Sequence, residues 1–247
     1  MSKNIAAILF DFGDTLVMFP RLAANDKSAS FKKIVKRMYD FLVKNGFKIE
    51  WEPFFENYRI IRLKQIEMQR QTGREYDLRE RVSKTLEALG INLPPGSEII
   101  EKALEEYLKG YERSVTIERE TYTVLEKLHS EYKLGLITNF AYPPFFHKII
   151  EKFNLKRFFD AIVVSGEVGW AKPNPKIFHI ILSKLNLKPE KCIFVGDHPE
   201  IDIMGAKNVG MKTILLSKEK SSLYADLTIR DIRELLSAIN RLKIKEK

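Results

Sequence analysis

The sequence has little cysteine and no long hydrophobic run. Its 247 residues include one cysteine, Cys192, which excludes a disulfide framework within the chain and a cysteine-rich metal site. No stretch reaches the roughly 18 consecutive apolar residues that a membrane-spanning helix needs. The first apolar run, residues 5–10, is followed at once by Asp11 and is too short for a secretory signal. We therefore expect a soluble, cytoplasmic protein without a membrane partner.

Charge of one sign is not gathered into blocks either. Lysine and arginine number 42 and aspartate and glutamate 33, which gives a formal net charge of +9. A positive balance permits binding to nucleic acids, but here the basic residues are interleaved with glutamates along the chain. This pattern favours a solvated surface, and we expect no nucleic-acid partner. Nothing in the pattern indicates an oligomeric state.

Two patterns of apolar residues divide the chain. Residues 28–111 show helical spacing, interrupted by turns that contain glycine and proline. The later part alternates short apolar strands with helices, which indicates right-handed crossovers and a mostly parallel sheet covered on both faces. The sequence predicts an α/β fold in which residues 1–18 and 114–247 form a doubly wound core. An all-helical domain, residues 19–113, is inserted after the first strand.

Polar side chains follow the predicted strands at the points where these strands end. The strands are expected at residues 5–10, 133–138, 161–165, 191–196 and 212–216, and helices at 120–131, 144–153, 175–186, 200–208 and from residue 231. Asp11 follows the first strand, and Thr138 and Asn139 follow the second. Lys172 lies in the loop after the third strand, and Asp197 follows the fourth. In a doubly wound sheet these ends converge on one crevice, so we expect a shared site.

Four ordered motifs carry these residues. They read ILFDFGDTL at the first strand, LGLITN at the second, VGWAKPNPKIF around Lys172 and VGDHPEIDIMGAKNVG from the fourth strand onward. In these motifs the chain resembles the haloacid dehalogenase-like hydrolase superfamily, most of whose members are magnesium-dependent phosphatases. The resemblance covers the first strand and essentially all of residues 115–235. It implies a Rossmann-like core and identifies the helical insertion as a cap that closes over the crevice.

The resemblance implies a nucleophilic aspartate and a magnesium site. Asp11 would attack a phosphate monoester and form an aspartyl-phosphate. Repulsion between two like charges at 4 Å is roughly 4 kcal/mol at an effective dielectric of about 20, so cations are required. The family likeness places Mg²⁺ on the Asp11 carboxylate, the Gly13 carbonyl and Asp197. Asp202 would complete this set by orienting a metal-bound water.

The other implied site residues bind the substrate, which we expect to be a small phosphorylated metabolite. Lys172 would neutralise both the nucleophile and a phosphoryl oxygen. Thr138 would hold a second phosphoryl oxygen through its hydroxyl. Asn139 is expected among the substrate-binding residues as well.

The first motif departs from the commonest family pattern. That pattern has a second aspartate two residues after the nucleophile, which protonates the leaving group and later activates water. Here that position is Gly13, and the acid follows one residue later as Asp14. Glycine cannot transfer a proton, and such transfer is typically worth about 10² to 10⁴ in rate. Either Asp14 substitutes, or turnover is slow except on substrates with good leaving groups.

Two other functions stay open at this point. A 2-haloacid dehalogenase also uses an aspartate nucleophile but needs no metal, and Asp197 argues against that chemistry. A catalytically weak binding or regulatory protein would keep the metal site and lack the acid at Gly13. The leading prediction is a Mg²⁺-dependent phosphatase that works through Asp11.

Overall fold

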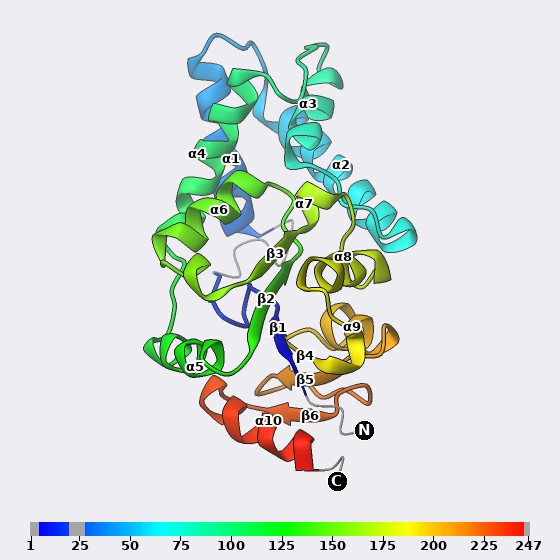
Figure 1. The fold of residues 1–247 in the computed structure, drawn as a ribbon. Coiled ribbons are helices and arrows are strands. Elements are labelled where there is room, and N and C mark those ends of the chain that lie inside the picture. The colour runs from blue at the N-terminus through cyan, green and yellow to red at the C-terminus, as the bar shows by residue number, and fades with distance from the viewer. Residues whose placement is uncertain (1–4, 20–27, 245–247) are drawn as a thin grey trace. The chain divides into compact units, whose positions relative to one another are not determined.

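The computed structural model of the protein describes residues 5–19 and 28–244. The chain divides into two compact units, coloured along the sequence in Figure 1. The first combines Met1–Met18 with Thr116–Lys247, and the second is Phe19–Val115. Met18 and Thr116 exchange two backbone hydrogen bonds, of 2.8 and 3.1 Å. These bonds close the first unit at the point where the second is inserted.

The first unit is built on a sheet whose six strands in the described residues all run parallel. The strand order is β3-β2-β1-β4-β5-β6. Their bounds are β1 Ala7–Phe10, β2 Lys133–Thr138, β3 Ala161–Val164, β4 Cys192–Gly196, β5 Lys212–Leu216 and β6 Leu227–Ile229. Because the chain winds outward from β1 in one direction and from β4 in the other, a crevice opens between the carboxyl ends of these two strands. The predicted doubly wound α/β fold is confirmed, and the sheet is wholly parallel.

Helices cover both faces of this sheet, as the ribbon in Figure 1 shows. They are α5 Arg119–His129, α6 Pro143–Lys152, α7 Ser165–Val168, α8 Pro175–Leu185, α9 Gly205–Asn208 and α10 Leu235–Ile244. Leu9 packs in one apolar cluster with residues of α8 such as Ile181. Successive strand residues point to opposite faces, so Ile8 and Phe10 lie on the face opposite that of Leu9. All four residues of β1 are buried. Burial on both faces explains why β1 reads as a continuous apolar run.

Several predicted boundaries differ from the structure by one or two residues, and at three places the type of element differs as well. The helix expected at 200–208 begins as a π-helix, Pro199–Met204, and only its end, α9, is an α-helix. Ser165 starts α7 and does not close the third strand. The last helix opens with a 3₁₀ turn, Ile232–Glu234, before α10. Two further 3₁₀ turns, Lys156–Phe158 and Pro189–Lys191, lead into β3 and β4.

The second unit consists of helices in its described residues. They are α1 Ala29–Lys44, α2 Trp51–Thr72, α3 Leu78–Glu87 and α4 Glu98–Glu112. Ser28 caps α1 by accepting a hydrogen bond from the N–H of Phe31, and Gly73 ends α2 in the left-handed conformation with φ of 68°. The interior is aromatic, with the rings of Phe31 and Phe54 both within 6.5 Å of the Tyr58 ring, centre to centre. This burial gives the unit a hydrophobic core of its own.

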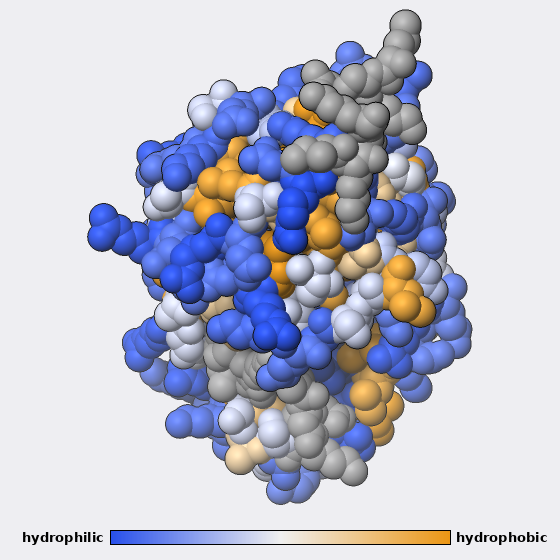
Figure 2. All heavy atoms as spheres, turned by 90° about the horizontal axis from the view of Figure 1, so that it is seen from below, coloured by the Kyte–Doolittle hydropathy of each residue, from blue (hydrophilic) through white to orange (hydrophobic). Residues whose placement is uncertain are grey.

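Polar side chains cover most of the face shown in Figure 2, and the hydrophobic ones form separate small groups. This agrees with a composition in which 30% of the residues are charged. None of the helices in the described part of the chain is long and apolar enough to cross a membrane.

The buried ring of Phe178 in α8 provides a test of this core. The ring is fully buried and makes an edge contact with Phe194 of β4, with 5.5 Å between ring centres. Removing it leaves a cavity that the rigid sheet cannot fill, so we expect Phe178→Ala to lower the free energy of unfolding by about 3–5 kcal/mol in urea titrations. Leu223 is fully exposed, and Leu223→Ala should change stability by less than about 0.5 kcal/mol. Equal effects of the two substitutions would contradict this placement of the core.

Candidate active site

Asp11 lies directly beyond β1, at the edge of the crevice. Its backbone N–H donates to the carbonyl of Val195 in β4 at 2.9 Å, which fixes the main chain at this point. The residue is only 7% exposed. The chain then turns back, with the Leu16 N–H donating to the Phe12 carbonyl, so that the hydroxyl of Thr15 donates to Oδ2 of Asp11 at 3.3 Å. The Asp11 carboxylate is thus held on one side by its own turn.

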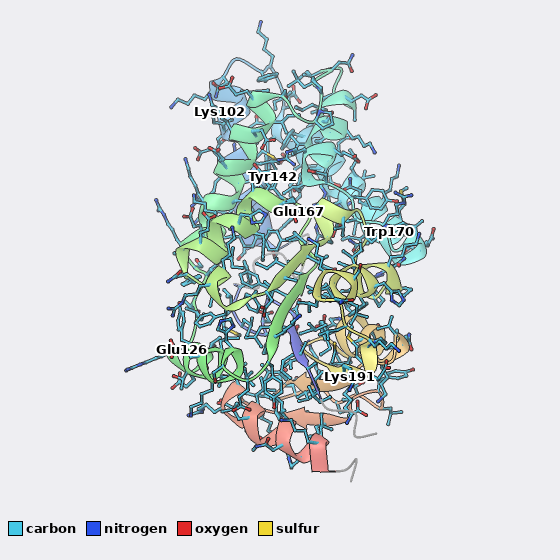
Figure 3. All side chains as sticks on the ribbon, in the orientation of Figure 1. Lys102, Glu126, Tyr142, Glu167, Trp170 and Lys191 are labelled. Carbon is cyan, nitrogen blue, oxygen red and sulfur yellow. The ribbon has the colours of Figure 1, made fainter. Side chains whose placement is uncertain are left out.

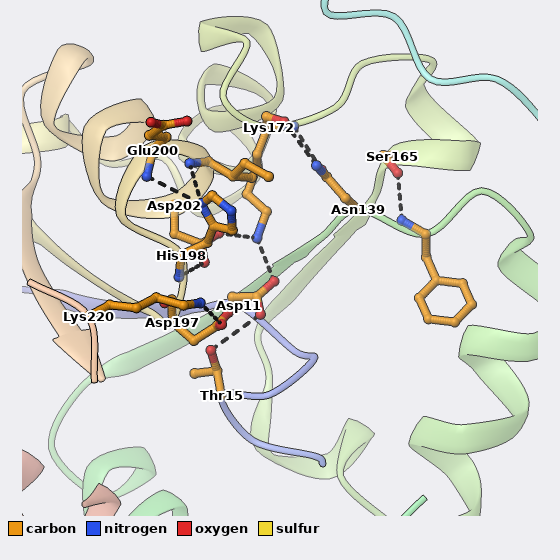
Figure 4. A network of polar contacts seen from close by, with 12 residues as sticks. Asp11, Thr15, Asn139, Ser165, Lys172, Asp197, His198, Glu200, Asp202 and Lys220 are labelled. Atoms are coloured by element: carbon orange, nitrogen blue, oxygen red, sulfur yellow. Dashed lines mark hydrogen bonds and ion pairs between the residues drawn. The ribbon is translucent and has the colours of Figure 1, made fainter. Parts of the chain in front are cut away.

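Lys172 contacts the same carboxylate from the other side. Its Nζ lies 2.5 Å from Oδ1 of Asp11 and 2.7 Å from Oδ1 of Asp202 (Figure 4). The lysine is 3% exposed, and charged groups are rarely buried this deeply unless they are paired. Asp11 and Lys172 are 161 positions apart in the sequence, so the fold itself creates this ion pair. The structure thereby brings together the predicted nucleophile and the predicted lysine.

The Lys172 loop is fastened by the amide of Asn139. The amide group of Asn139 donates to the Lys172 carbonyl at 2.9 Å and accepts from the Lys172 N–H at 2.7 Å. Both polar atoms of this side chain therefore bind the Lys172 backbone, although the sequence predicts a contact with substrate. Trp170, labelled in Figure 3, precedes Lys172 in the same loop. The Nζ of Lys176 lies over its ring, 3.6 Å from the ring centre. The two hydrogen bonds of Asn139 thus fix the backbone position of Lys172.

Asp202, in the π-helical segment after β4, is the second carboxylate partner of Lys172. Its Oδ2 accepts the N–H of His198 at 3.0 Å, and its Oδ1 binds Lys172, so both carboxylate oxygens have protein partners. The ring of His198 accepts the N–H groups of Glu200 and Ile201, each at 3.3 Å. These local bonds compete with a regular α-helix and explain the π-helical start of the segment.

Gly196, the last residue of β4, is required by the close approach of Asp202. A Cβ atom at Gly196 would lie 2.6 Å from the Cβ of Asp202, far inside a normal contact. The glycine thus allows the Asp202 carboxylate to reach Lys172 beneath the strand end. A close backbone approach is a recurrent use of glycine in strands.

Asp197 stands at the more open side of the same crevice. Its side chain is 23% exposed, and its Oδ2 lies 3.2 Å from the Nζ of Lys220. Ligand oxygens of Asp11, Asp197 and Asp202 all lie within 4.8 Å of one another. The sequence does not point to Lys220, because this lysine lies outside every motif and 23 positions beyond Asp197.

The remaining predicted site residues occupy the same edge of the sheet. Thr138 ends β2 with a buried side chain. Gly13 lies in the turn after Asp11, where it forms an isolated parallel bridge with Val17. Asp14 has a φ of 57°, a left-handed conformation that is uncommon for a residue with a side chain. The turn therefore places an aspartate where glycine is the favoured residue.

Burial and like charge dominate the electrostatics of this cluster. Burial raises the pKa of Asp11 to about 7; Lys172 opposes this effect, and the nearby Asp202 adds to it. Burial also raises the pKa of Asp197, with a further contribution from Asp202. For Lys172, burial lowers the pKa, but its two aspartate partners outweigh that effect and hold the ammonium charged. The buried Lys172 ammonium thus pairs with two of the three carboxylates, and Lys220 pairs with the third.

This donor set fits a hard divalent cation. The carboxylate oxygens converge from two strand ends, and carboxylates with added water are what Mg²⁺ prefers. A cation there would offset the burial and the repulsion from Asp202 that raise the pKa values of Asp11 and Asp197. Asp11 and Asp202 each have both carboxylate oxygens bonded to protein groups, and Asp197 is the carboxylate at the open side of the cluster.

The fold is thus a parallel α/β sheet with an aspartate–lysine–aspartate cluster at its switch point. A family model described as haloacid dehalogenase-like hydrolase matches residues 8–216, and the chain belongs to this family. The protein is therefore a hydrolase, and the resemblance inferred from the four motifs is confirmed.

Full-length relatives are phosphatases by name. The chain is 29% identical to the glyceraldehyde 3-phosphate phosphatase of Pyrococcus furiosus, over 97% of this chain and 95% of the relative. It is 28% identical to the ribulose-1,5-bisphosphate 5-phosphatase of Halopiger xanaduensis, over 87% and 86% of the two chains. Among solved structures, a 2-haloacid dehalogenase from Pseudomonas syringae pv. tomato matches with a TM-score of 0.68 and 22% identity, covering 96% of this chain and 99% of that one. This last likeness shows the fold alone.

The raised pKa of Asp11 predicts an unusual dependence of stability on pH in the metal-free protein. With a pKa of about 7 in the folded state, Asp11 keeps its proton where the unfolded chain, with a pKa near 3.9, has lost it. Stability should therefore fall as the pH rises from about 4 to about 7. In EDTA at pH 8 we expect Asp11→Asn to be more stable than the unsubstituted protein, by on the order of 1 kcal/mol, and near pH 4 to match it.

Asp231 provides a control of opposite sign. Its hydrogen bonds with Arg233 lower its pKa to about 2, so its contribution is present above the unfolded pKa and lost as the pH falls through about 2. Asp231→Asn should therefore destabilise the protein at neutral pH and cease to do so in strong acid. A stability difference for Asp11→Asn that does not vary with pH would contradict the electrostatic description of the cluster.

Proposed function

We propose that the protein is a Mg²⁺-dependent phosphatase that hydrolyses a small phosphorylated metabolite through an aspartyl-phosphate on Asp11. The observation that carries this proposal is the buried Asp11 carboxylate, held by Lys172 within a cluster of three aspartates. The names of the full-length relatives support the same reaction class. A cytoplasmic location, as the sequence predicts, is part of the proposal.

The reaction would proceed in two displacements. One carboxylate oxygen of Asp11 attacks phosphorus; the bond from phosphorus to the leaving oxygen breaks, and the alcohol departs with a proton. Water then attacks phosphorus, which releases inorganic phosphate and restores the carboxylate. Lys172 is fixed beside the attacking group and would neutralise the phosphoryl oxygens, and the Thr138 hydroxyl would donate to one of them.

The metal would be held by Asp11, Asp197 and the carbonyl of Gly13, with Asp202 supporting from behind. When bound, it supplies positive charge that offsets the repulsion between the nucleophile and the phosphoryl group. Asp202 would maintain the position of Lys172 and the β4 end through the two bonds described above. Asn139, through its bonds to the Lys172 backbone, would act as a positioning residue.

Asp14 is the proton donor in this proposal. Its left-handed φ is a local conformational cost that a glycine would avoid. Its charge also adds to the raised pKa of Asp197, less than burial and Asp202 do and against the opposing effect of Lys220, which places it in the electrostatic neighbourhood of the cluster. The helical unit, Phe19–Val115, would serve as the cap that selects the substrate and excludes water during the first displacement.

The direct test is phosphate release from an aryl phosphate and from a panel that includes glyceraldehyde 3-phosphate and ribulose 1,5-bisphosphate. We expect activity with Mg²⁺, none with EDTA, and a loss of about 10³-fold or more in Asp11→Asn. Chloride release from 2-chloropropionate in EDTA would instead indicate a dehalogenase. Metal binding without turnover on the whole panel would indicate a binding or regulatory protein.

The role of Asp14 is tested by comparing leaving groups. An alkoxide needs a proton and an aryloxide barely does, so Asp14→Asn should lower kcat on alkyl phosphates by about 10²- to 10⁴-fold and on p-nitrophenyl phosphate far less. Asp14→Gly should lose the same activity while relieving the backbone at a φ of 57°. An unchanged rate on alkyl phosphates in either variant would exclude Asp14 as the proton donor.

A further inference from the structure

Lys220 is a cation at the proposed metal site that lies outside the four motifs. It belongs to the loop that follows β5, at the same sheet edge as the end of β4. Its Nζ lies 3.2 Å from Oδ2 of Asp197 and 3.3 Å from the Asp197 backbone carbonyl (Figure 4). The loop is shaped by Ser217, whose Oγ accepts the N–H of Lys220 at 2.9 Å.

The two lysines of the site divide the aspartates between them. Lys172 is buried and binds Asp11 and Asp202. Lys220 binds Asp197, and its side chain is 43% exposed. A half-exposed pair of this kind is worth about 0–1 kcal/mol, so water or another cation can replace it easily. The deeply buried pairs of Lys172 have no such freedom.

We propose that Lys220 is a displaceable counter-ion of Asp197. Its ammonium pairs with the Asp197 carboxylate in the metal-free protein and leaves this carboxylate when a divalent cation binds. This inference rests on the proposed metal site. The ammonium and the cation compete for the same carboxylate, and they also repel each other at short range. Both effects weaken metal binding, so the site binds the metal less tightly than it would without Lys220.

The experiment is a titration of the full-length, metal-free protein with Mn²⁺, in which the free ion is measured by electron paramagnetic resonance. Removing a pair worth up to about 1 kcal/mol should tighten the Kd in Lys220→Ala by about 2- to 5-fold. Lys220→Arg keeps the charge and should bind Mn²⁺ about as the unsubstituted protein does. Asp197→Asn removes the shared carboxylate and should abolish or strongly weaken binding.

Lys218 supplies a matched control. It lies in the same loop and carries the same charge, but the carboxyl group whose pKa its charge lowers is Asp231. Lys218→Ala should leave the Mn²⁺ Kd unchanged, which separates a specific competition at Asp197 from a general change in net charge.

The possible outcomes separate this inference from the proposed function. An equal or weaker Mn²⁺ affinity in Lys220→Ala, with normal binding to the unsubstituted protein, would overturn the role of Lys220 and leave the phosphatase proposal standing. Equal tightening in Lys218→Ala and Lys220→Ala would also overturn it. If neither the unsubstituted protein nor any variant binds Mn²⁺, the proposed metal site and the proposed role of Lys220 are both wrong.

Discussion

The ion pairs of Lys172 are the interaction on which the site depends. One buried ammonium connects the end of β1, through Asp11, with the segment after β4, through Asp202. Neither carboxylate could be buried at this depth without it, because an unpaired charge in such surroundings is strongly destabilising. Burial raises the pKa of Asp11, Lys172 opposes this effect, and the neighbouring Asp202 adds to it. The three carboxylates lie close enough together that they could hold a metal ion.

The fold supplies the geometry through a few close contacts. A wholly parallel sheet brings the ends of β1, β2 and β4 to one edge. Gly196 lets Asp202 pass under the end of β4, and the amide of Asn139 fixes the backbone of Lys172. Both contacts hold Asp11, Lys172 and Asp202 within the distances that charge compensation requires.

Much of this arrangement could be predicted from the sequence, because strand ends and apolar runs are local features. The run at residues 5–10 identified β1, and its end identified Asp11. The π-helical start after β4 could not be predicted, since it results from hydrogen bonds of His198 that the helical pattern does not encode. The sequence predicts Asn139 among the substrate-binding residues but not its hydrogen bonds to the Lys172 backbone, which lies 33 positions away. The sequence does not predict the role of Lys220 either, because only the folded loop brings this lysine to Asp197.

The central claim is that the Asp11 carboxylate becomes the phosphoryl carrier. The most direct measurement is to quench turnover of a phosphate substrate in acid, reduce the trapped acyl phosphate with borohydride and map the peptides by mass spectrometry. The claim predicts that Asp11 is converted to homoserine only when substrate and Mg²⁺ are both present. Continued release of phosphate with Asp11 unmodified, or with the modification at another residue, would contradict it.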